Sequence, residues 1–173
     1  MEPALEYING NNLSVGGYLL THGHFDHTLG MDKVDGNIYI NLDDEFLARN
    51  PQEQLSSFTN SELDVQSYEG ELHDISTFTH TDINIYRNPG HTKGSISYEF
   101  KNLGVIFTGD FVFAQGIGRT DLYSGDTNEM KESINNIFLN FDKEFEVFPG
   151  HGNTDTVNNI LNYNSYLKEF ING

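Results

Sequence analysis

The stretch Thr21-His-Gly-His-Phe-Asp-His27 places three histidines and one aspartate within six positions, and it decides how the rest of the chain is interpreted. It follows a short apolar run that predicts a buried strand ending in a loop. His22 and His24 are two residues apart, so on extended backbone both side chains point to the same side and could chelate one ion. Asp26 and His27 follow on a turn, where they could serve a second ion close by.

Three later segments carry the same residue types beside glycine, each after a predicted strand. Pro-Gly-His ends at His91 and again at His151, and Thr-Gly-Asp ends at Asp110. Strand ends in a layered fold converge on one edge, so these side chains are expected beside the first histidine loop. Imidazole and carboxylate suit Zn²⁺ and Fe²⁺. The sequence therefore predicts two metal sites, in which His91 and His151 each complete one and Asp110, with two oxygens, could bridge both. His73 and His80 lack this context and are expected to be ordinary residues.

Composition excludes several classes of function. The chain has 173 residues, 36% of them hydrophobic, which is enough for one domain over 1–173 with a real core. Cys is 0, so thiolate metal ligands, disulfides and a cysteine nucleophile are excluded. The 26 acidic residues outnumber the 9 basic ones, and the resulting charge of -17 disfavours nucleic acid as a partner. No apolar run approaches the roughly 20 residues of a membrane span, and the acidic start is no secretory signal, so we expect a cytoplasmic protein without membrane partners.

Short strands and helices follow one another along the chain, which indicates an α+β fold. Apolar spacing and capping residues predict helices at the start of the chain, after Asn41, over 126–141, and over 160–170. The acidic run 43–45 is expected to favour the dipole of the second of these helices, which should end before Pro51. Strands are expected over 38–40, 83–86, 95–100 and 105–108, with 145–148 as the last strand. Residues 52–70 are polar and irregular, which predicts a loop.

Four segments together resemble the metallo-β-lactamase superfamily. The stretch 21–27 matches its signature, and 88–95, 107–110 and 148–152 match its later motifs in order. Within the superfamily the chain is most similar to the small, single-domain glyoxalase II-like hydrolases, with which it shares Gly118-Arg-Thr-Asp-Leu122. The resemblance implies a four-layer αββα sandwich of the α+β class, with a dinuclear site on one edge.

The same resemblance implies a ligand set for two divalent metal ions, zinc in the first place and iron or manganese as alternatives. By that likeness the first ion takes His22, His24, His91 and Asp110. The second ion takes Asp26, His27, Asp110 and His151.

Glyoxalase II-like enzymes hydrolyse S-acyl thiol conjugates such as S-lactoylglutathione, so the resemblance implies a hydrolase acting on a small-molecule thioester. Two close cations can lower the pKa of a bridging water from about 15.7 to roughly 7. Hydroxide could then attack the thioester carbonyl, with Asp26 orienting it and Asp110 bridging the ions. The nearest polar candidates for substrate contact are Lys93, Tyr98 and Arg119. Tyr98 also suits a structural strand position, and Arg119 a loop anchor.

Several rival functions share part of this pattern. A β-lactamase is disfavoured by the bridging carboxylate at Asp110 and by the lack of a cysteine ligand, and an RNA nuclease by the net charge of -17. A persulfide dioxygenase with one iron shares Gly-Arg-Thr-Asp, but the complete second set of ligands favours two ions. A metal-binding but inactive scaffold stays open as a further alternative.

The two ends of the chain depart from the superfamily pattern. Two or three strands usually precede the first helix, but only about 20 residues precede the histidine cluster, so we expect the N-terminal strands to be missing. A second copy of the chain could cover the sheet edge and apolar surface left exposed. Full-length glyoxalase II also carries a later helical domain that helps to hold glutathione, and the chain stops at Gly173, so the thiol carrier stays open.

Overall fold

The computed structural model describes residues 2–58 and 65–172 and contains two main sheets. The first sheet has three parallel strands in the order β1 (Tyr18–Leu19), β2 (Ile38–Ile40), β3 (His73–Asp74). The second sheet has five strands in the order β10 (Asp155–Thr156), β9 (Glu146–Pro149), β6 (Val105–Gly109), β5 (Ile96–Phe100), β4 (Ile83–Arg87). Its neighbours are antiparallel except β6 and β9, which are parallel.

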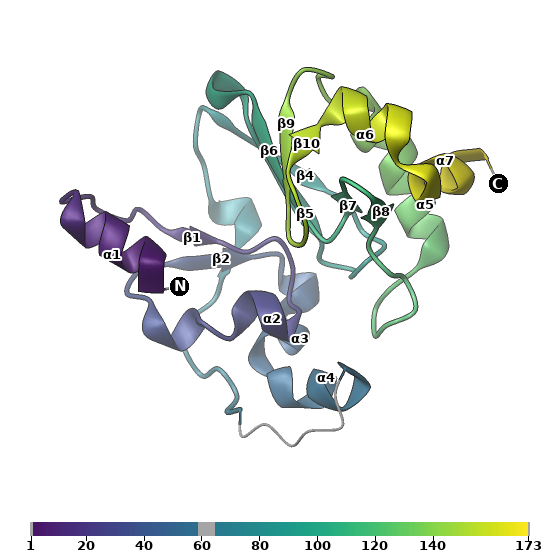
Figure 1. Cartoon of the computed structure of the whole chain (residues 1–173). Coiled ribbons are helices and arrows are strands. Elements are labelled where there is room, and N and C mark those ends of the chain that lie inside the picture. The colour runs from purple at the N-terminus through teal and green to yellow at the C-terminus, as the bar shows by residue number, and fades with distance from the viewer. Residues whose placement is uncertain (1, 59–64, 173) are drawn as a thin grey trace.

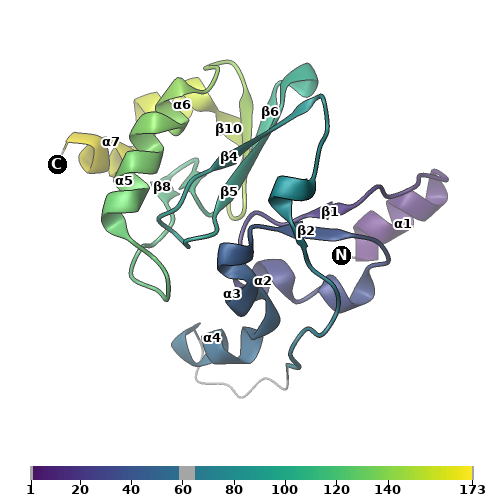
Figure 2. The same cartoon turned by 180° about the vertical axis from the view of Figure 1, so that it is seen from behind.

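Helices lie on the two outer sides of this pair of sheets (Figures 1 and 2). On the side of the three-stranded sheet are α2 (Phe25–Thr28), α3 (Glu45–Arg49) and α4 (Pro51–Phe58). On the side of the five-stranded sheet are α5 (Thr127–Asn136), α6 (Val157–Tyr163) and α7 (Ser165–Asn172). The chain begins with α1 (Glu2–Gly10), and a small hairpin is formed by β7 (Val112–Phe113) and β8 (Gly116–Ile117).

Three apolar clusters show that the elements are stacked in four layers. Ile106 and Val147 of the five-stranded sheet are buried with Met130 of α5 and Ile160 of α6. A middle cluster is shared between the two sheets, where Leu19 and Tyr39 of the first meet Ile96 of the second. A third cluster buries Ile38 and Ile40 against Ala48 of α3. Each sheet therefore has one face on the other sheet and one face on helices, and the predicted αββα sandwich is confirmed.

The capping residues that the sequence predicted are present. The side chain of Asn41 accepts a hydrogen bond from the backbone N–H of Asp43 at the start of a 3₁₀ turn that leads into α3. The side chain of Asp126 accepts from the N–H groups of Asn128 and Glu129 and so caps α5. Both caps satisfy donors that have no partner within the helix itself.

The prediction of a loop over 52–70 was wrong at its beginning. Residues 51–58 form α4, and Pro51 occupies its first turn. Proline suits that position because its missing N–H would have no partner there in any case and its φ is already helical. Residues 59–64 of the predicted loop lie outside the described residues.

Two further boundaries differ from the sequence prediction. The strand at 145–148 is not the last, because β10 follows it and pairs with β9. The closing helix is divided at Asn164, whose side-chain amide donates to the carbonyls of Phe113 and Gly116, while its Oδ1 accepts from the N–H of Leu167. Asn164 is fully buried, so these bonds to the β7–β8 hairpin outweigh the continuation of the helix.

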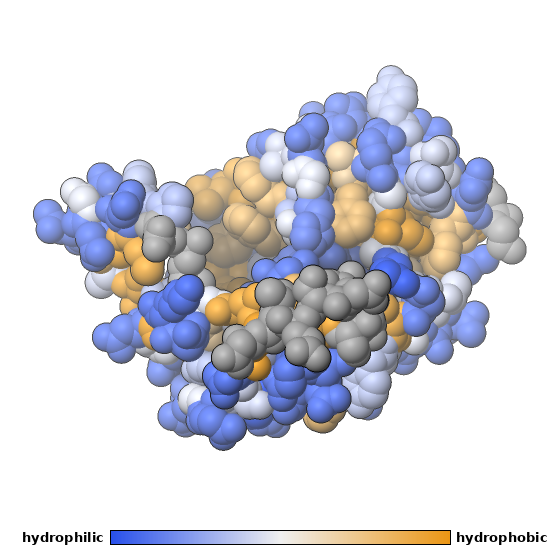
Figure 3. Space-filling view, turned by 60° about the horizontal axis from the view of Figure 1, so that its bottom comes forward, coloured by the Kyte–Doolittle hydropathy of each residue, from blue (hydrophilic) through white to orange (hydrophobic). Residues whose placement is uncertain are grey.

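An apolar recess of about 320 Å³ opens between the two sheets near α1. It is lined mainly by Leu19, Tyr98, Phe100 and Phe107, and Figure 3 shows the apolar surface between α1 and the five-stranded sheet. A second copy of the chain covering this surface remains a prediction. In the described part of the chain, no helix has both the length and the hydrophobicity needed to cross a bilayer.

Candidate metal centre

The seven predicted ligands lie together at one edge of the sandwich. Each follows a strand of one of the two sheets: the loop after β1 and the helix α2 supply four of them, and the loops after β4, β6 and β9 supply one each. The residues are His22, His24, Asp26, His27, His91, Asp110 and His151. Segments up to about 130 positions apart in sequence therefore share one small volume, as convergence of strand ends predicts.

The first cluster consists of His22, His24 and His91. One nitrogen of each ring lies within 4.8 Å of the others, and His24 Nδ1 is 2.9 Å from His91 Nε2. All three side chains are buried. Three imidazoles crowded into a space without solvent are an arrangement that a divalent cation stabilises.

Neighbouring oxygen atoms orient two of these rings. His91 Nδ1 lies 2.7 Å from the carbonyl oxygen of Arg119, to which it donates when protonated, and this leaves Nε2 free to face the cluster. Thr21 Oγ1 lies 3.2 Å from Nδ1 of His22. Such outer partners fix the tautomer of a metal-binding histidine.

The second cluster consists of Asp26, His27 and His151. Asp26 Oδ2 is 3.0 Å from His151 Nε2 and 3.6 Å from His27 Nε2. In contrast to the first cluster, Asp26 and His151 are partly open to solvent. This cluster is therefore the side of the centre that water and a substrate reach first.

Asp110 lies between the two clusters. Its Oδ1 is 3.3 Å from His27 Nε2, and its Oδ2 is 3.6 Å from His91 Nε2 and 3.5 Å from His151 Nε2. The close packing here requires glycine at position 150, because a Cβ atom would collide with Asp110 Oδ1 and would lie 2.6 Å from Cε1 of His27. The two oxygens of Asp110 thus face ligand atoms of both clusters, which is the placement that a bridging carboxylate needs.

Unpartnered buried atoms test whether a metal fits this site. Among the described residues, Nε2 of His22, Nε2 of His27 and Oδ1 of Asp110 are buried and make no hydrogen bond. Buried polar atoms without partners are costly and rare in folded proteins. All three point into the centre with nitrogen or carboxylate donors, so divalent cations fit the residues present.

The protonation of the histidines also fits metal binding. Burial lowers the pKa of His22 and His91, and it lowers the pKa of His24 to about 4. Burial also acts to lower the pKa of His27, but the carboxylate of Asp110, 3.3 Å from its Nε2, outweighs burial and raises this pKa. The pKa of Asp110 is lowered despite burial, because His27 and the other histidines favour its charged form. The first cluster therefore offers neutral imidazoles at neutral pH, the form that binds metal.

These pKa shifts predict that the metal-free protein loses stability in mild acid. In the unfolded chain histidine binds a proton below about pH 6.5, whereas folded His24 stays neutral down to about pH 4. The unfolded state binds more protons between these values, so the free energy of unfolding falls as the pH falls. His22 and His91 act in the same direction, whereas the raised pKa values of His27 and Asp44 oppose them.

We expect urea unfolding of chelator-treated protein to show a free energy lower by about 2 kcal/mol at pH 5 than at pH 6.5. Saturating the protein with metal should not abolish this difference, because bound imidazoles take up no protons while the histidines of the unfolded chain still do. A metal-free protein as stable at pH 5 as at pH 6.5 would contradict the burial of neutral histidines in the first cluster.

Asp44 is a residue of the site that the sequence analysis missed. Its side chain is fully buried and accepts hydrogen bonds from the N–H of Gly23 at 2.9 Å, the N–H of Gly94 at 2.7 Å and the hydroxyl of Thr92 at 2.6 Å. The expectation that the run 43–45 merely favours a helix dipole is therefore wrong for this residue. Asp44 instead joins the loop of His22 and His24 to the loop of His91. No local sequence signal distinguishes it from its acidic neighbours.

Asp44→Ala should weaken metal binding without removing a ligand. It leaves three buried donors without an acceptor, which costs roughly 3 kcal/mol or more of folding stability. The two ligand loops then lose their common anchor, and we expect metal affinity to fall about 10–100-fold, as for other outer partners of metal ligands.

Asp44→Asn keeps the shape and one acceptor oxygen, so its loss of metal affinity should be smaller than that of Asp44→Ala. Asp43→Ala is the matched control, because Asp43 pairs with exposed Arg87 and Lys93 and contacts neither loop backbone at the first cluster. Competition with a chelating dye measures the affinities. Equal metal affinity in Asp44→Ala and Asp43→Ala would exclude this anchoring role.

The three residues proposed for substrate contact lie in different surroundings. Arg119 lines a pocket of about 340 Å³ over the metal centre, together with five of the predicted ligands and Leu122. Lys93 is exposed and its Nζ lies 3.6 Å from Asp43. Tyr98 does not reach the centre: its ring is buried between the sheets and its hydroxyl donates to the carbonyl of Leu20 at 2.6 Å. Tyr98 is therefore a structural residue, because a strand position facing the core has no access to substrate.

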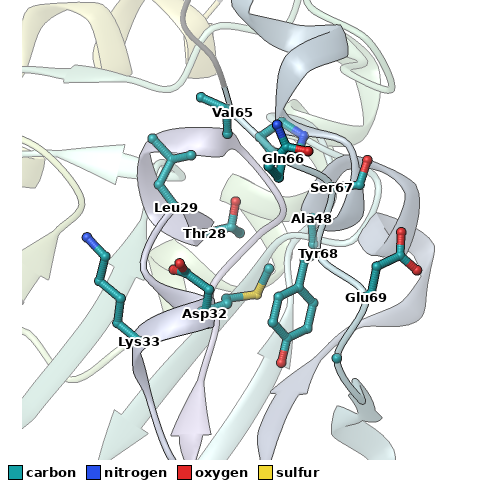
Figure 4. Close-up of a pocket in the computed structure, with 13 residues that line it drawn as sticks. Thr28, Leu29, Asp32, Lys33, Ala48, Val65, Gln66, Ser67, Tyr68 and Glu69 are labelled. Atoms are coloured by element: carbon teal, nitrogen blue, oxygen red, sulfur yellow. The ribbon is translucent and has the colours of Figure 1, made fainter.

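A further pocket lies away from the metal centre. It measures about 460 Å³ and is lined by residues of 28–33 and 65–70 together with Ala48 and Pro51 (Figure 4). None of the seven predicted ligands lines it. Five of the predicted metal ligands line the pocket of about 340 Å³ instead, so we assign the reaction to that pocket.

Comparisons with known proteins agree with this geometry. The sequence profile of the Metallo-beta-lactamase superfamily matches residues 2–151. The chain is 30% identical to "Hydroxyacylglutathione hydrolase GloC" of Haemophilus influenzae over 177 residues, which cover 96% of this chain and 82% of the relative.

Two solved structures share the fold over nearly the whole chain. The crystal structure of TTHA1623 in a di-iron-bound form has a TM-score of 0.77 at 23% identity and covers 95% of this chain and 84% of that one. The BLEG-1 B3 metallo-beta-lactamase has a TM-score of 0.74 at 30% identity and covers 96% of this chain and 83% of that one. With the profile match, the αββα fold and the histidine clusters, these likenesses show that the chain belongs to the metallo-β-lactamase superfamily.

Proposed function

We propose that this protein is a metal-dependent hydrolase that cleaves thioesters of small molecules, using two divalent ions. The observation that carries the proposal is the pair of ligand clusters with Asp110 between them. The GloC relative at 30% identity, named as a hydroxyacylglutathione hydrolase, supports a thioester as the substrate. Zinc is the ion we expect first, and iron or manganese suits the same nitrogen and oxygen donors.

The metal ions have one chemical task in this proposal. Bound by the two clusters, they supply hydroxide at neutral pH and polarise the carbonyl of the substrate. His22, His24 and His91 would hold the first ion and His27 and His151 the second, with Asp26 as a further ligand and Asp110 shared.

Asp26 has the best placement for orienting the attacking water. Its Oδ2 lies in the partly open cluster, 3.0 Å from His151 Nε2, and it also lines the pocket over the centre. A carboxylate there can accept a proton from water and hold its lone pair toward the carbonyl carbon. No strong general acid is needed on the other side, because a thiol has a pKa near 8.5 and leaves readily as thiolate.

A small, uncharged or anionic substrate fits the rest of the molecule better than a macromolecule does. The net charge of -17 opposes nucleic acid. Arg119 at the pocket could contact the thiol carrier. We also propose that the protein works in the cytoplasm, where thiol conjugates are abundant and reduced thiols persist.

Hydrolysis assays with the metal-loaded protein test this function. We expect release of free thiol from S-acyl conjugates of glutathione or coenzyme A, abolished by a chelator and restored by Zn²⁺, Fe²⁺ or Mn²⁺. Nitrocefin is the necessary second substrate, because the structure named as a B3 metallo-beta-lactamase is 30% identical to this chain.

Oxygen uptake with a glutathione persulfide tests the dioxygenase alternative in the same preparation. Thioester hydrolysis well above that of the chelator-treated protein would support the proposal. Nitrocefin turnover or oxygen uptake without thiol release would overturn it, and a loaded protein inactive in every assay would favour the inactive scaffold.

A further inference from the structure

A second pocket, of about 240 Å³, adjoins the metal centre on the side of α3 and α4. Its lining comprises His24, Phe46, Leu47, Glu53, Gln54, Leu122 and Tyr123. We propose that this pocket receives the acyl group of the substrate and that it selects thioesters whose acyl group is apolar. The inference rests on the proposed thioester hydrolysis and names the substrate class of that same site.

Two aromatic rings form the outer part of this pocket. Phe46 of α3 is 52% exposed and Tyr123 is 66% exposed, and their ring centroids lie 5.6 Å apart. Large apolar side chains that stay exposed together beside a cavity are typical of ligand-binding surfaces. The exposed rings offer apolar area that an acyl chain lying against them would bury.

The polar residues at the inner end of the pocket are engaged elsewhere. Gln54 is buried, its Oε1 accepts from the N–H of Phe25, and its Nε2 donates to the carbonyls of Gly23 and Leu47. Its amide therefore has its partners in the protein and holds the wall in place. An apolar occupant needs no hydrogen bond from this amide, so it leaves the partners of Gln54 undisturbed.

The pocket is continuous with the site of reaction. His24 and Leu122 line both this pocket and the larger one over the metal centre. A thioester carbonyl held at the centre has two substituents, the acyl chain and the thiol carrier, and these extend from it in different directions. One of them can enter the pocket beside His24, and the other can follow the pocket that contains Arg119.

The charged side chains that line the two pockets indicate which substituent enters each of them. Apart from histidine, the residues that line the pocket of about 240 Å³ include one charged side chain, Glu53. Its carboxylate repels the carboxylates or phosphates of common thiol carriers. Arg119 lines the larger pocket and attracts them, although it is also paired with Asp121. The acyl group therefore occupies the pocket of Phe46 and Tyr123, and the anionic carrier lies toward Arg119.

Acyl chain length on a single thiol tests the assignment by kinetics. Among glutathione thioesters, kcat/KM should rise from S-lactoyl to S-butanoyl and S-hexanoyl, by up to about fourfold for each methylene that is buried. Phe46→Ala and Tyr123→Ala should remove most of this rise, so that the ratio of kcat/KM for S-hexanoyl to kcat/KM for S-lactoyl falls towards one. Tyr163→Ala, on α6 and 71% exposed, is the matched control and should behave as the unmodified protein.

Binding without turnover gives an independent readout. Titration calorimetry of butanoate, hexanoate and octanoate into chelator-treated and metal-loaded protein should show affinity that rises with chain length and a negative heat-capacity change. Phe46→Ala should flatten this dependence and Tyr163→Ala should not.

The outcomes separate this inference from the proposed function. Chain-length-dependent binding without any thiol release would support the apolar pocket and overturn the thioesterase. Thiol release with equal kcat/KM for lactoyl and hexanoyl, or with Phe46→Ala indistinguishable from Tyr163→Ala, would overturn the pocket and leave the thioesterase intact.

Discussion

Asp110→Ala should bind neither metal ion tightly and should release no thiol above the level of chelator-treated protein. The two oxygens of Asp110 face both clusters, at 3.3 Å from His27 and at 3.6 and 3.5 Å from His91 and His151. Its removal takes an anionic ligand from each ion and leaves two sets of imidazoles whose bound cations repel each other without a shared negative charge. We expect metal affinity at both sites to fall by more than about 100-fold, the upper range for losing a mere outer partner.

Asp110→Asn refines this result, because it keeps one oxygen and the shape of the side chain. It should retain some metal at the first cluster, which has three histidines of its own, and little at the second. Asp35→Ala, which removes an exposed carboxylate that belongs to neither ligand cluster, is the control and should bind as the unmodified protein does. Elemental analysis after gel filtration measures ions per chain. Two ions retained in Asp110→Ala would show that the carboxylate is no bridge.

His151→Ala should lose one ion and His91→Ala should lose the other. His151 belongs to the open cluster and its side chain is 57% exposed, whereas the side chain of His91 is only 4% exposed and contacts His24. Removing His151 leaves the buried cluster of three histidines complete, so one ion should remain at nearly unchanged affinity. Thiol release should nevertheless fall by at least about 100-fold, because the proposed function divides the supply of hydroxide and the polarisation of the substrate between two ions.

The two variants must differ in stability as well as in metal content. His91→Ala leaves His22 and His24 as two buried imidazoles without the third ligand, and it removes a ring oriented by the carbonyl of Arg119. His151→Ala removes a ring at the surface, so its unfolding free energy without metal should stay within about 0.5 kcal/mol of that of the unmodified protein. Native mass spectrometry counts the ions. Two ions bound to His151→Ala, or none, would refute the division of the ligands into two sites.

The grouping of the predicted ligands could be anticipated from the sequence because they have local signals. His22 and His24 alternate on extended backbone after an apolar run, and His91 and His151 each follow Pro-Gly. Convergence of strand ends then predicts their proximity without any knowledge of side-chain contacts. Asp44 has no such signal, because its three donors come from Gly23, Thr92 and Gly94 in two separate loops. Its role depends on tertiary contacts alone.

The same distinction explains the errors in the fold. Asp126 was recognised as a cap because its partners are two and three residues away. The division between α6 and α7 could not be predicted in this way, because Asn164 donates hydrogen bonds to the carbonyls of Phe113 and Gly116, about 50 positions earlier. Tyr98 was proposed as a substrate contact because alternation in a strand does not reveal which face of the sheet meets the second sheet. The structure places it in the core between the sheets.

An anomalous difference map from crystals of the metal-loaded protein tests the central claim most directly. The account predicts two peaks for each chain. One should lie among His22, His24 and His91, the other among Asp26, His27 and His151, and an oxygen of Asp110 should reach each of them. A single peak, or peaks that lie away from Asp110, would contradict it.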